Sequence, residues 1–457
     1  MKNIYQQINL ALNKSNRLKK SVLFSYSFSI ESDNLITLIS HPSINNNDVY
    51  FLGKPNKGFM MIGLNAIKKY HIKEDLEMID DISNVISNLE DNKIGPKILG
   101  GHSFTSIKKD DVVWGDFPSS LFIIPECLAM QENNQLWLTI STFVLYNDNI
   151  NQITNQFIEL CKTYKKIFFQ RPIKTKRMEI DYSIDYPDKE KYIEQVQSIV
   201  GMIDSDNIKK VVLSRMKKIY LKEVIHITSI IQLLQSLYIN CTIFVYNVPK
   251  QGLFFGATPE KLCTLHNKNI TTGALAGTIG RNKNNTKDQL LTDLLLDSKK
   301  DNQEHQLVVE QIVHKLKTYV KFNLISKKPE IVKLNNVQHL FTPIKGSLIE
   351  KMNILELIKI LHPTAAIAGV PTSKALSLIK KYEQFNRGWY AGAIGWMNQY
   401  GHGEFYVSLR SGLIKNKSAY LFAGGGIVKD SNPEDEWHET SLKLKSMLDI
   451  FKTNKVI

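Results

Sequence analysis

Two glutamates near the end of the chain, Glu436 and Glu439, are spaced so that both can act on one ligand. They follow the apolar segment 420–423 and three glycines, 424–426, in a stretch whose composition predicts a helix. Residues three apart lie on one helix face, with Cβ atoms about 5–6 Å apart. The pair can therefore form half of a metal site.

A purely structural role is the alternative for the same acidic stretch. Residues 431–435, SNPED, offer a polar N-cap, a proline suited to the first helical position and two acidic residues that complement the helix dipole. Glu436 and Glu439 continue into the second turn, beside glycines that permit close approach of the backbone to a ligand. Capping and ligand binding both remain open for this stretch.

Three other charged side chains have types that could move protons or hold a metal. Lys210 begins the apolar segment KVVLSR, and a buried lysine can act as a general base. Glu260 follows a Thr-Pro turn between two apolar segments, and a desolvated glutamate can act as a general acid. Glu304 lies in the helical segment KKDNQEHQLVVEQI. The alternative for each is an ordinary surface role: Lys210 as a solvated lysine, Glu260 as a turn glutamate and Glu304 as a glutamate on a solvated helix face.

Arg410 lies within the apolar segment EFYVSLRSGL. Strand alternation would place it on one face with Ser408 and Tyr406. An arginine in such surroundings needs an anionic partner, and a substrate carboxylate matches its planar fork.

Composition narrows the class of protein. The 457 residues are 43% hydrophobic and carry a formal charge of +14, but the basic residues are scattered and accompany no nucleic-acid-binding motif. A basic nucleic-acid-binding protein is kept as the non-enzyme alternative. The four cysteines form no CxxC pair, and neither glycine run matches a nucleotide-binding motif. The chain shows no signal-peptide pattern and no run of about 18 apolar residues, so we expect a cytoplasmic protein.

The apolar patterns predict a mixture of helices and antiparallel strands. Hairpins are expected at 47–64 and 120–145, and the polar stretch 170–189 is the best candidate for a boundary. One long helix is expected over 286–319, with Leu290 and Leu294 among its apolar positions, and residues 388–425 read as consecutive strands. Strands far outnumber βαβ units, which favours an antiparallel or mixed α/β (α+β) architecture.

Nine segments, in order, resemble motifs of the chorismate-utilising enzymes, the family of isochorismate synthases, salicylate synthases and anthranilate synthase component I. They are KVVLSR, GATPE, ALAGTIGR, KDNQEHQLVVEQI, LHPTAAIAGVP, GWYAGAIGW, FYVSLRSG, FAGGGIV and EDEWHETSLKLK. The resemblance implies one domain over residues 1–457, with two face-packed antiparallel sheets flanked by helices. Residues 190–450 would form the chorismate-binding catalytic part, and residues 1–189 match only loosely.

The resemblance also implies a role for each candidate. Lys210 would activate water, Glu260 would protonate the departing C4 hydroxyl, and Mg²⁺ would be held by Glu304, Glu436 and Glu439. Substrate contacts would come from Gly277, Ala366, Arg410, Gly424, Gly425 and Lys443.

Ala366 points to the subtype, because isochorismate synthases resemble this chain in carrying alanine there, whereas ammonia-using members and salicylate synthases carry threonine. The resemblance thus implies an Mg²⁺-dependent isochorismate synthase acting on chorismate, without nucleic acid, membrane or an obligatory glutaminase partner. We expect a place in menaquinone biosynthesis, with siderophore biosynthesis open. Salicylate synthase and anthranilate or aminodeoxychorismate synthase component I are the alternative activities.

Overall fold

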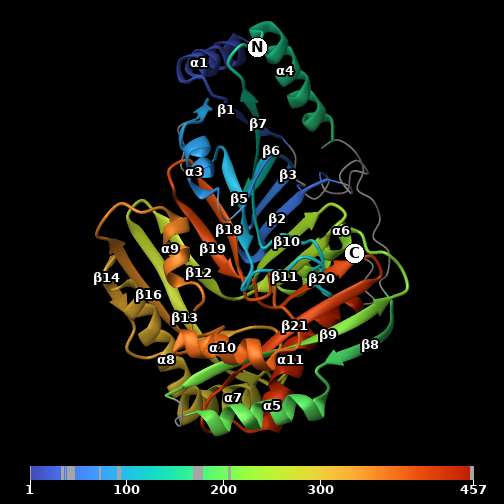
Figure 1. Ribbon diagram of the computed structural model, residues 1–457, viewed down its shortest axis with the longest axis vertical. Helices are drawn as coiled ribbons and strands as arrows, with labels where there is room; N and C mark the ends of the chain where they lie inside the picture. Colours follow the sequence, from blue (N-terminus) through green and yellow to red (C-terminus); the bar gives the residue numbers. More distant parts are fainter. Residues whose placement is uncertain are drawn as a thin grey trace.

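The computed structural model describes residues 2–31, 35, 38, 47–71, 74–89, 94–167, 179–203 and 207–452. Its strands form one hydrogen-bonded network, almost entirely antiparallel, whose two arms meet at β6 (Ser120–Glu132) (Figure 1). The expected antiparallel α/β fold is confirmed, and its two sheets are continuous through β6.

The first arm runs from β6 to the edge strand β8 (Ile180–Tyr186). In order of pairing it contains β3 (Phe59–Tyr70), β2 (Val49–Lys54), β10 (Thr242–Val248), β11 (Gly252–Thr258), β20 (Ser411–Lys415), β21 (Ser418–Ile427) and β9 (Lys210–Leu221). The short β17 (Gly369–Val370) also pairs with β9. On the other side of β6 lie β7 (Gln135–Val144), β1 (Val22–Ile30) and β4 (Ile86–Ser87).

The second arm leaves the same strand in the other direction. It contains β5 (Lys97–His102), β18 (Ala393–Asn398), β19 (Gly403–Val407), β12 (Lys261–His266), β13 (Asn269–Gly280) and β16 (Val337–Leu348), with β14 (Val320–Ile325) and β15 (Glu330–Lys333) beside β16. Strands that precede residue 189 pair directly with strands that follow it in both arms.

The central strands of the first arm bury both faces, which gives the protein two cores. On β10, Phe244 and Tyr246 join a core shared with the second arm, where Phe405 lies. The alternate residues Ile243 and Val245 join another core on the opposite face. Alternation along a strand thus supplies both cores.

Helices cover the outer faces of both arms (Figure 1). The second core is closed by α1 (Lys2–Leu18), α4 (Ile150–Ile167), α6 (Ile227–Leu237) and α11 (Pro433–Lys452). The remaining helices are α3 (Asp75–Ser83), α5 (Lys189–Met202), α7 (Asn285–Asp297), α8 (Lys299–Leu316), α9 (Ile354–Leu361) and α10 (Thr372–Tyr382). Among the described residues, no helix is long and apolar enough to cross a bilayer.

The prediction of a single helix over 286–319 is wrong, because the segment forms two helices. It is divided at Ser298, whose backbone is extended and whose hydroxyl accepts a hydrogen bond from the Asp301 amide, so that α8 starts afresh. Leu290 and Leu294 on α7 are 59% and 61% exposed rather than buried. Residues 180–186 of the expected polar connection form β8, and residues 170–178 lie outside the described part.

The prediction of a continuous strand through Arg410 is also wrong. β19 ends at Val407 in the second arm, and β20 begins at Ser411 in the first arm. Residues 408–410 make the crossing, and Arg410 adopts a left-handed φ of 46°. Arg410 therefore does not alternate with Ser408 and Tyr406 along one strand.

Candidate active site

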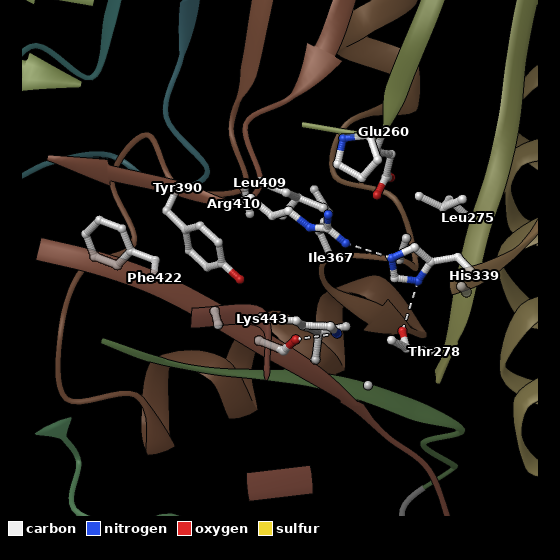
Figure 2. Close-up of a pocket in the computed structure, with 18 of the residues that line it drawn as sticks. Glu260, Leu275, Thr278, His339, Ile367, Tyr390, Leu409, Arg410, Phe422 and Lys443 are labelled. Carbon is white, nitrogen blue, oxygen red and sulfur yellow. Dashed lines mark hydrogen bonds between the residues drawn. The ribbon is translucent and has the colours of Figure 1, made fainter. Parts of the chain in front are cut away.

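A pocket of about 740 Å³, counting its open mouth, lies where the chain crosses between the two arms. One crossing carries Pro259 and Glu260 between β11 and β12, and the other carries Leu409 and Arg410 between β19 and β20. Of the predicted site residues, the wall contains Glu260, Gly277, Glu304, Ala366, Arg410, Gly424 and Lys443. Figure 2 labels Glu260, Arg410 and Lys443 among them. The other four, Lys210, Gly425, Glu436 and Glu439, lie behind the wall and contact its residues or their neighbours.

Lys210 is fully buried at the start of β9, and its ammonium lies 2.8 Å from Glu304 Oε1. The angles leave this ion pair without a well-directed hydrogen bond. Burial alone would raise the pKa of Glu304, but the charges of Lys210, Lys443 and Lys300 outweigh it and lower the pKa below its usual value. Glu304 is therefore held as a carboxylate, and Lys210 must leave this pair before it can act as a base.

Gly426 explains how these two side chains fit together. A Cβ built at this position would lie 2.3 Å from Glu304 Oε1 and 2.9 Å from Lys210 Cε. The neighbouring Gly425 makes room in the same way for Glu436 Oε2, at 2.8 Å. Glycines in β21 thus clear space for functional side chains that come from α8, β9 and α11.

Glu260 is the group best suited to proton transfer at neutral pH. It is 6% exposed, and burial raises its pKa to about 7, against the opposing charges of Lys210 and Lys443. Its position is fixed through the backbone, because its amide donates to Thr258 Oγ1 and its carbonyl accepts from the Val407 amide. A carboxyl group that still holds its proton near pH 7 can donate it to a leaving group.

The two glutamates of α11 that were predicted to bind metal are each paired with a lysine. Glu436 Oε1 lies 2.8 Å from Lys300 Nζ and accepts a hydrogen bond from Ser431 Oγ. Glu439 Oε1 lies 2.6 Å from Lys443 Nζ, which also donates to the carbonyl of Gly424. The helix therefore presents alternating charges to the end of β21.

The ammonium group of Lys300 lies close to three carboxylates, those of Glu304, Glu436 and Glu439. Burial alone would lower its pKa, but Glu436, Glu439 and Glu304 together raise it above its usual value. Burial and the neighbouring Glu439 raise the pKa of Glu436 to about 7, and its Oε2 atom is buried without a hydrogen-bond partner. This cluster fits a hard divalent cation, which prefers oxygen donors. As the side chains stand, the described part of the chain contains no group of three or more acidic, histidine or cysteine residues arranged around one metal position.

Arg410 is buried in the pocket wall with no carboxylate partner among the described residues (Figure 2). One guanidinium nitrogen lies 3.0 Å from His339 Nε2. The guanidinium can only donate, so Nε2 accepts, and Nδ1 carries the proton that it directs to the carbonyl of Gly277 at 3.2 Å. Burial and the charges of Arg410 and Lys443 hold the pKa of His339 well below its usual value. A neutral histidine thus orients an unpaired arginine.

Two elements of the pocket are shaped by backbone irregularities. Gly277 has a φ of 75° at a bulge between β13 and β16, which exposes its carbonyl to His339. Ala366 lies in the loop after α9, and the neighbouring Ala365 amide donates to Gln311 on α8. The small side chain of Ala366 leaves this side of the pocket without a nucleophile of its own.

Sequence reasoning missed several residues that shape the site, because their signal is tertiary. Tyr390 stacks on Phe422 in the wall, and His339 orients Arg410. Behind the wall, Arg215 of β9 holds α11 through the Thr440 and Ser441 hydroxyls and pairs with Asp185. Arg387 donates to the carbonyls of Val212 and Ile367, and Lys300 faces the carboxylate cluster. Only Lys300, one helical turn before Glu304, could have been found from spacing.

Known proteins resemble the chain over its whole length. The family model of chorismate binding enzymes matches residues 7–452. The chain is 30% identical to the isochorismate synthase MenF of Bacillus subtilis (strain 168), over 96% of this chain and 95% of that protein. It is 46% identical to the salicylate biosynthesis isochorismate synthase of Pseudomonas aeruginosa, over 42% of this chain and 41% of that protein.

One solved structure shows how far the fold agrees. It is that of MenF, the menaquinone-specific isochorismate synthase from Escherichia coli, with a TM-score of 0.80 and 23% identity, and it covers 97% of this chain and all of that one. The chain belongs to the chorismate binding enzyme family.

Proposed function

We propose that the chain is an isochorismate synthase, which adds water at C2 of chorismate while the C4 hydroxyl leaves. One observation carries this proposal: Glu260, a carboxyl with a pKa of about 7, lines the pocket, and Lys210, buried behind the pocket wall, is near enough for its charge to act on that pKa. Such a pair supplies a proton donor for the leaving hydroxyl and a base for the incoming water. The water that adds at C2 gives one proton to Lys210, and the C4 hydroxyl takes one proton from Glu260 and leaves as water, so no atoms are gained or lost.

The charges in the pocket suit a substrate with two carboxylates. Arg410 has no anionic partner among the described residues and would pair with the pyruvyl carboxylate through its planar fork. Lys443 lies in the same wall and adds a second positive charge. Chorismate would therefore be drawn into the pocket and oriented by charge.

The carboxylates in and behind the pocket wall fit Mg²⁺. Glu304, Glu436 and Glu439 would hold it, and Lys300, the cation those carboxylates now share, would have to withdraw. When bound, Mg²⁺ supplies positive charge that holds the ring carboxylate of chorismate and its developing negative charge. Lys210 can take a proton from water only as the neutral amine, so it would first have to give up its ion pair with Glu304 and release its own proton to solvent.

Ala366 supports water as the nucleophile. Its methyl group offers no hydroxyl or amine that could position ammonia or attack the ring. We propose that the reaction needs no glutaminase partner. The full-length match with a MenF protein supports a role in menaquinone biosynthesis.

The test is to incubate the purified chain with chorismate and Mg²⁺ and to separate the products by liquid chromatography. We expect isochorismate alone, with the same rate when ammonia is added. Salicylate with pyruvate, or a product that forms only with ammonia, would overturn the proposal.

A further inference from the structure

A second cavity lies away from the chorismate pocket, between α9 and the β5–β6 pair of the second arm. It measures about 590 Å³, counting its open mouth, and its apolar wall includes Phe122, Leu355 and Ile358. The ion pair between Lys359 of α9 and Asp75 of α3 is part of its lining. The polar atoms of this cavity include hydrogen-bonding groups that the protein leaves unused.

Two histidine rings supply the first unused groups. His102 and His362 both line the cavity and meet edge to face, with ring centroids 4.7 Å apart. Each has one nitrogen bound to a backbone carbonyl: Nδ1 of His102 to Ser103 at 3.0 Å, and Nε2 of His362 to Ala391 at 2.9 Å. A carbonyl only accepts, so these nitrogens carry the protons, and His102 Nε2 and His362 Nδ1 are unprotonated acceptors.

Neither acceptor has a hydrogen-bond partner within the described part of the chain. Burial lowers the pKa of His102 and, together with the neighbouring His102 ring, lowers that of His362 to about 3, which keeps both rings neutral. The third unused group is the hydroxyl of Ser120, a residue only 3% exposed whose Oγ is buried without a partner. Both histidines are only partly buried, so their two acceptors can face the cavity, whereas the Ser120 hydroxyl is fully buried. Because buried polar atoms are almost always hydrogen-bonded, the unused Ser120 hydroxyl beside two open acceptors indicates a ligand that fills this cavity and supplies donors.

We propose that this cavity binds a small ring compound with neighbouring hydroxyl groups. The ring would lie against Phe122 and the leucine and isoleucine of α9, and its two O–H groups would donate to His102 Nε2 and His362 Nδ1. The hydroxyl of Ser120 would complete the contacts.

The cavity is joined to the chorismate pocket through His362. The carbonyl that its Nε2–H holds belongs to Ala391, which lines the chorismate pocket, and the loop that His362 begins carries Ala366. A ligand bound at His362 therefore acts on two parts of the pocket wall, and its binding changes the KM for chorismate.

The test uses catechol as the probe and 1,2-dimethoxybenzene, which has the same ring but no donors, as the matched control ligand. Ligand-observed NMR with the whole protein should show catechol binding and at least tenfold weaker binding of the dimethoxy compound. Binding should persist in the Glu260→Gln variant saturated with chorismate, which places it outside the chorismate pocket. Equal binding of both probes, binding of neither, or displacement by chorismate would overturn the proposal.

Variants locate the site. Ser120→Ala removes a hydroxyl with no partner and should leave the fold and kcat unchanged while weakening catechol binding roughly fivefold, the worth of one hydrogen bond. His102→Phe should weaken it further, whereas His266→Phe, in the separate His266–His402 pair, should not. Saturating catechol should change the chorismate KM at least twofold in the wild type but not in His102→Phe. Binding that survives both cavity variants, or a KM that catechol leaves unchanged, would refute the inference.

Discussion

Replacing Gly426 with alanine tests how the site is assembled, because this glycine has no conformational reason to be one. It pairs with Val212 in the β21–β9 ladder, and its added Cβ would lie 2.3 Å from Glu304 Oε1. Nonbonded heavy atoms settle at about 3.5–4 Å, so the Glu304 carboxylate must retreat by roughly 1 Å or more. Lys210 Cε, at 2.9 Å, would move with it.

Two magnitudes follow from this displacement. Overpacking a well-packed position costs about 1–3 kcal/mol in the free energy of unfolding, which urea titration measures. A shift of about 1 Å in catalytic groups can cost about 10²-fold, so we expect kcat/KM for chorismate to fall by about that factor. Mg²⁺ affinity, measured by calorimetry, should fall as well.

Gly280→Ala is the matched control, since its Cβ would meet nothing within 4 Å. It should keep wild-type kcat/KM and stability. Wild-type kcat/KM in Gly426→Ala, or an equal loss in both variants, would refute the reasoning.

Substitutions at four other positions test separate contacts of the site. Lys210→Ala and Glu260→Gln should each lower kcat by about 10²–10⁴-fold, and near-normal turnover in both variants would contradict the roles of these residues. The kcat/KM of the wild type should fall above about pH 7, as Glu260 loses its proton. Glu260 keeps its proton up to about pH 7 in the folded protein, whereas the unfolded chain releases it near pH 4.5, so the contribution of Glu260 to stability is present below pH 4.5 and is lost as the pH rises to 7. At pH 8, Glu260→Gln should therefore raise the free energy of unfolding by up to about 3 kcal/mol. An unchanged free energy of unfolding would be inconsistent with a buried, desolvated carboxyl. Arg410→Lys should raise the KM for chorismate about 10–100-fold, because an ammonium cannot make the two parallel hydrogen bonds of a guanidinium, and an unchanged KM would remove this arginine from substrate binding. Arg215→Ala should lower the free energy of unfolding by about 2–3 kcal/mol, because Thr440, Ser441 and Asp185 lose their partner, and Arg215→Lys should have an intermediate effect. A loss below about 0.5 kcal/mol in urea titration would show that other contacts hold α11.

Local patterns predicted most of the elements of this fold. The hairpins β2–β3 and β6–β7 follow alternating apolar segments around polar turns, and α5, α9 and α10 follow helical periodicity. The break at Ser298 was missed although a serine three residues before Asp301 is an ordinary N-cap signal. The apolar residues of α7 and α8 fit one helical pattern, so the pattern gave no sign of the break between the two helices.

The crossings between the arms could not be read from the sequence. The segment around Arg410 has a strand-like pattern on both sides, and only the identity of the strands that pair with β19 and β20 shows that the chain changes arms. The same limit applies to the site. The resemblance identified residues that line the pocket, but the roles of Lys300, His339 and Arg215 depend on partners 71 to 226 residues away.

The reaction in water labelled with ¹⁸O distinguishes addition of solvent from internal transfer of the C4 hydroxyl, because in the proposed reaction solvent enters at C2 while the C4 oxygen leaves. Chorismate, Mg²⁺ and the protein would be mixed in this water, and the product would be analysed by mass spectrometry at low conversion. We expect isochorismate with one ¹⁸O atom at C2 and no label in unreacted chorismate. Lys210→Ala should form this product at least about 10²-fold more slowly. Isochorismate without the label, which would mean internal transfer of the C4 hydroxyl, would contradict the account.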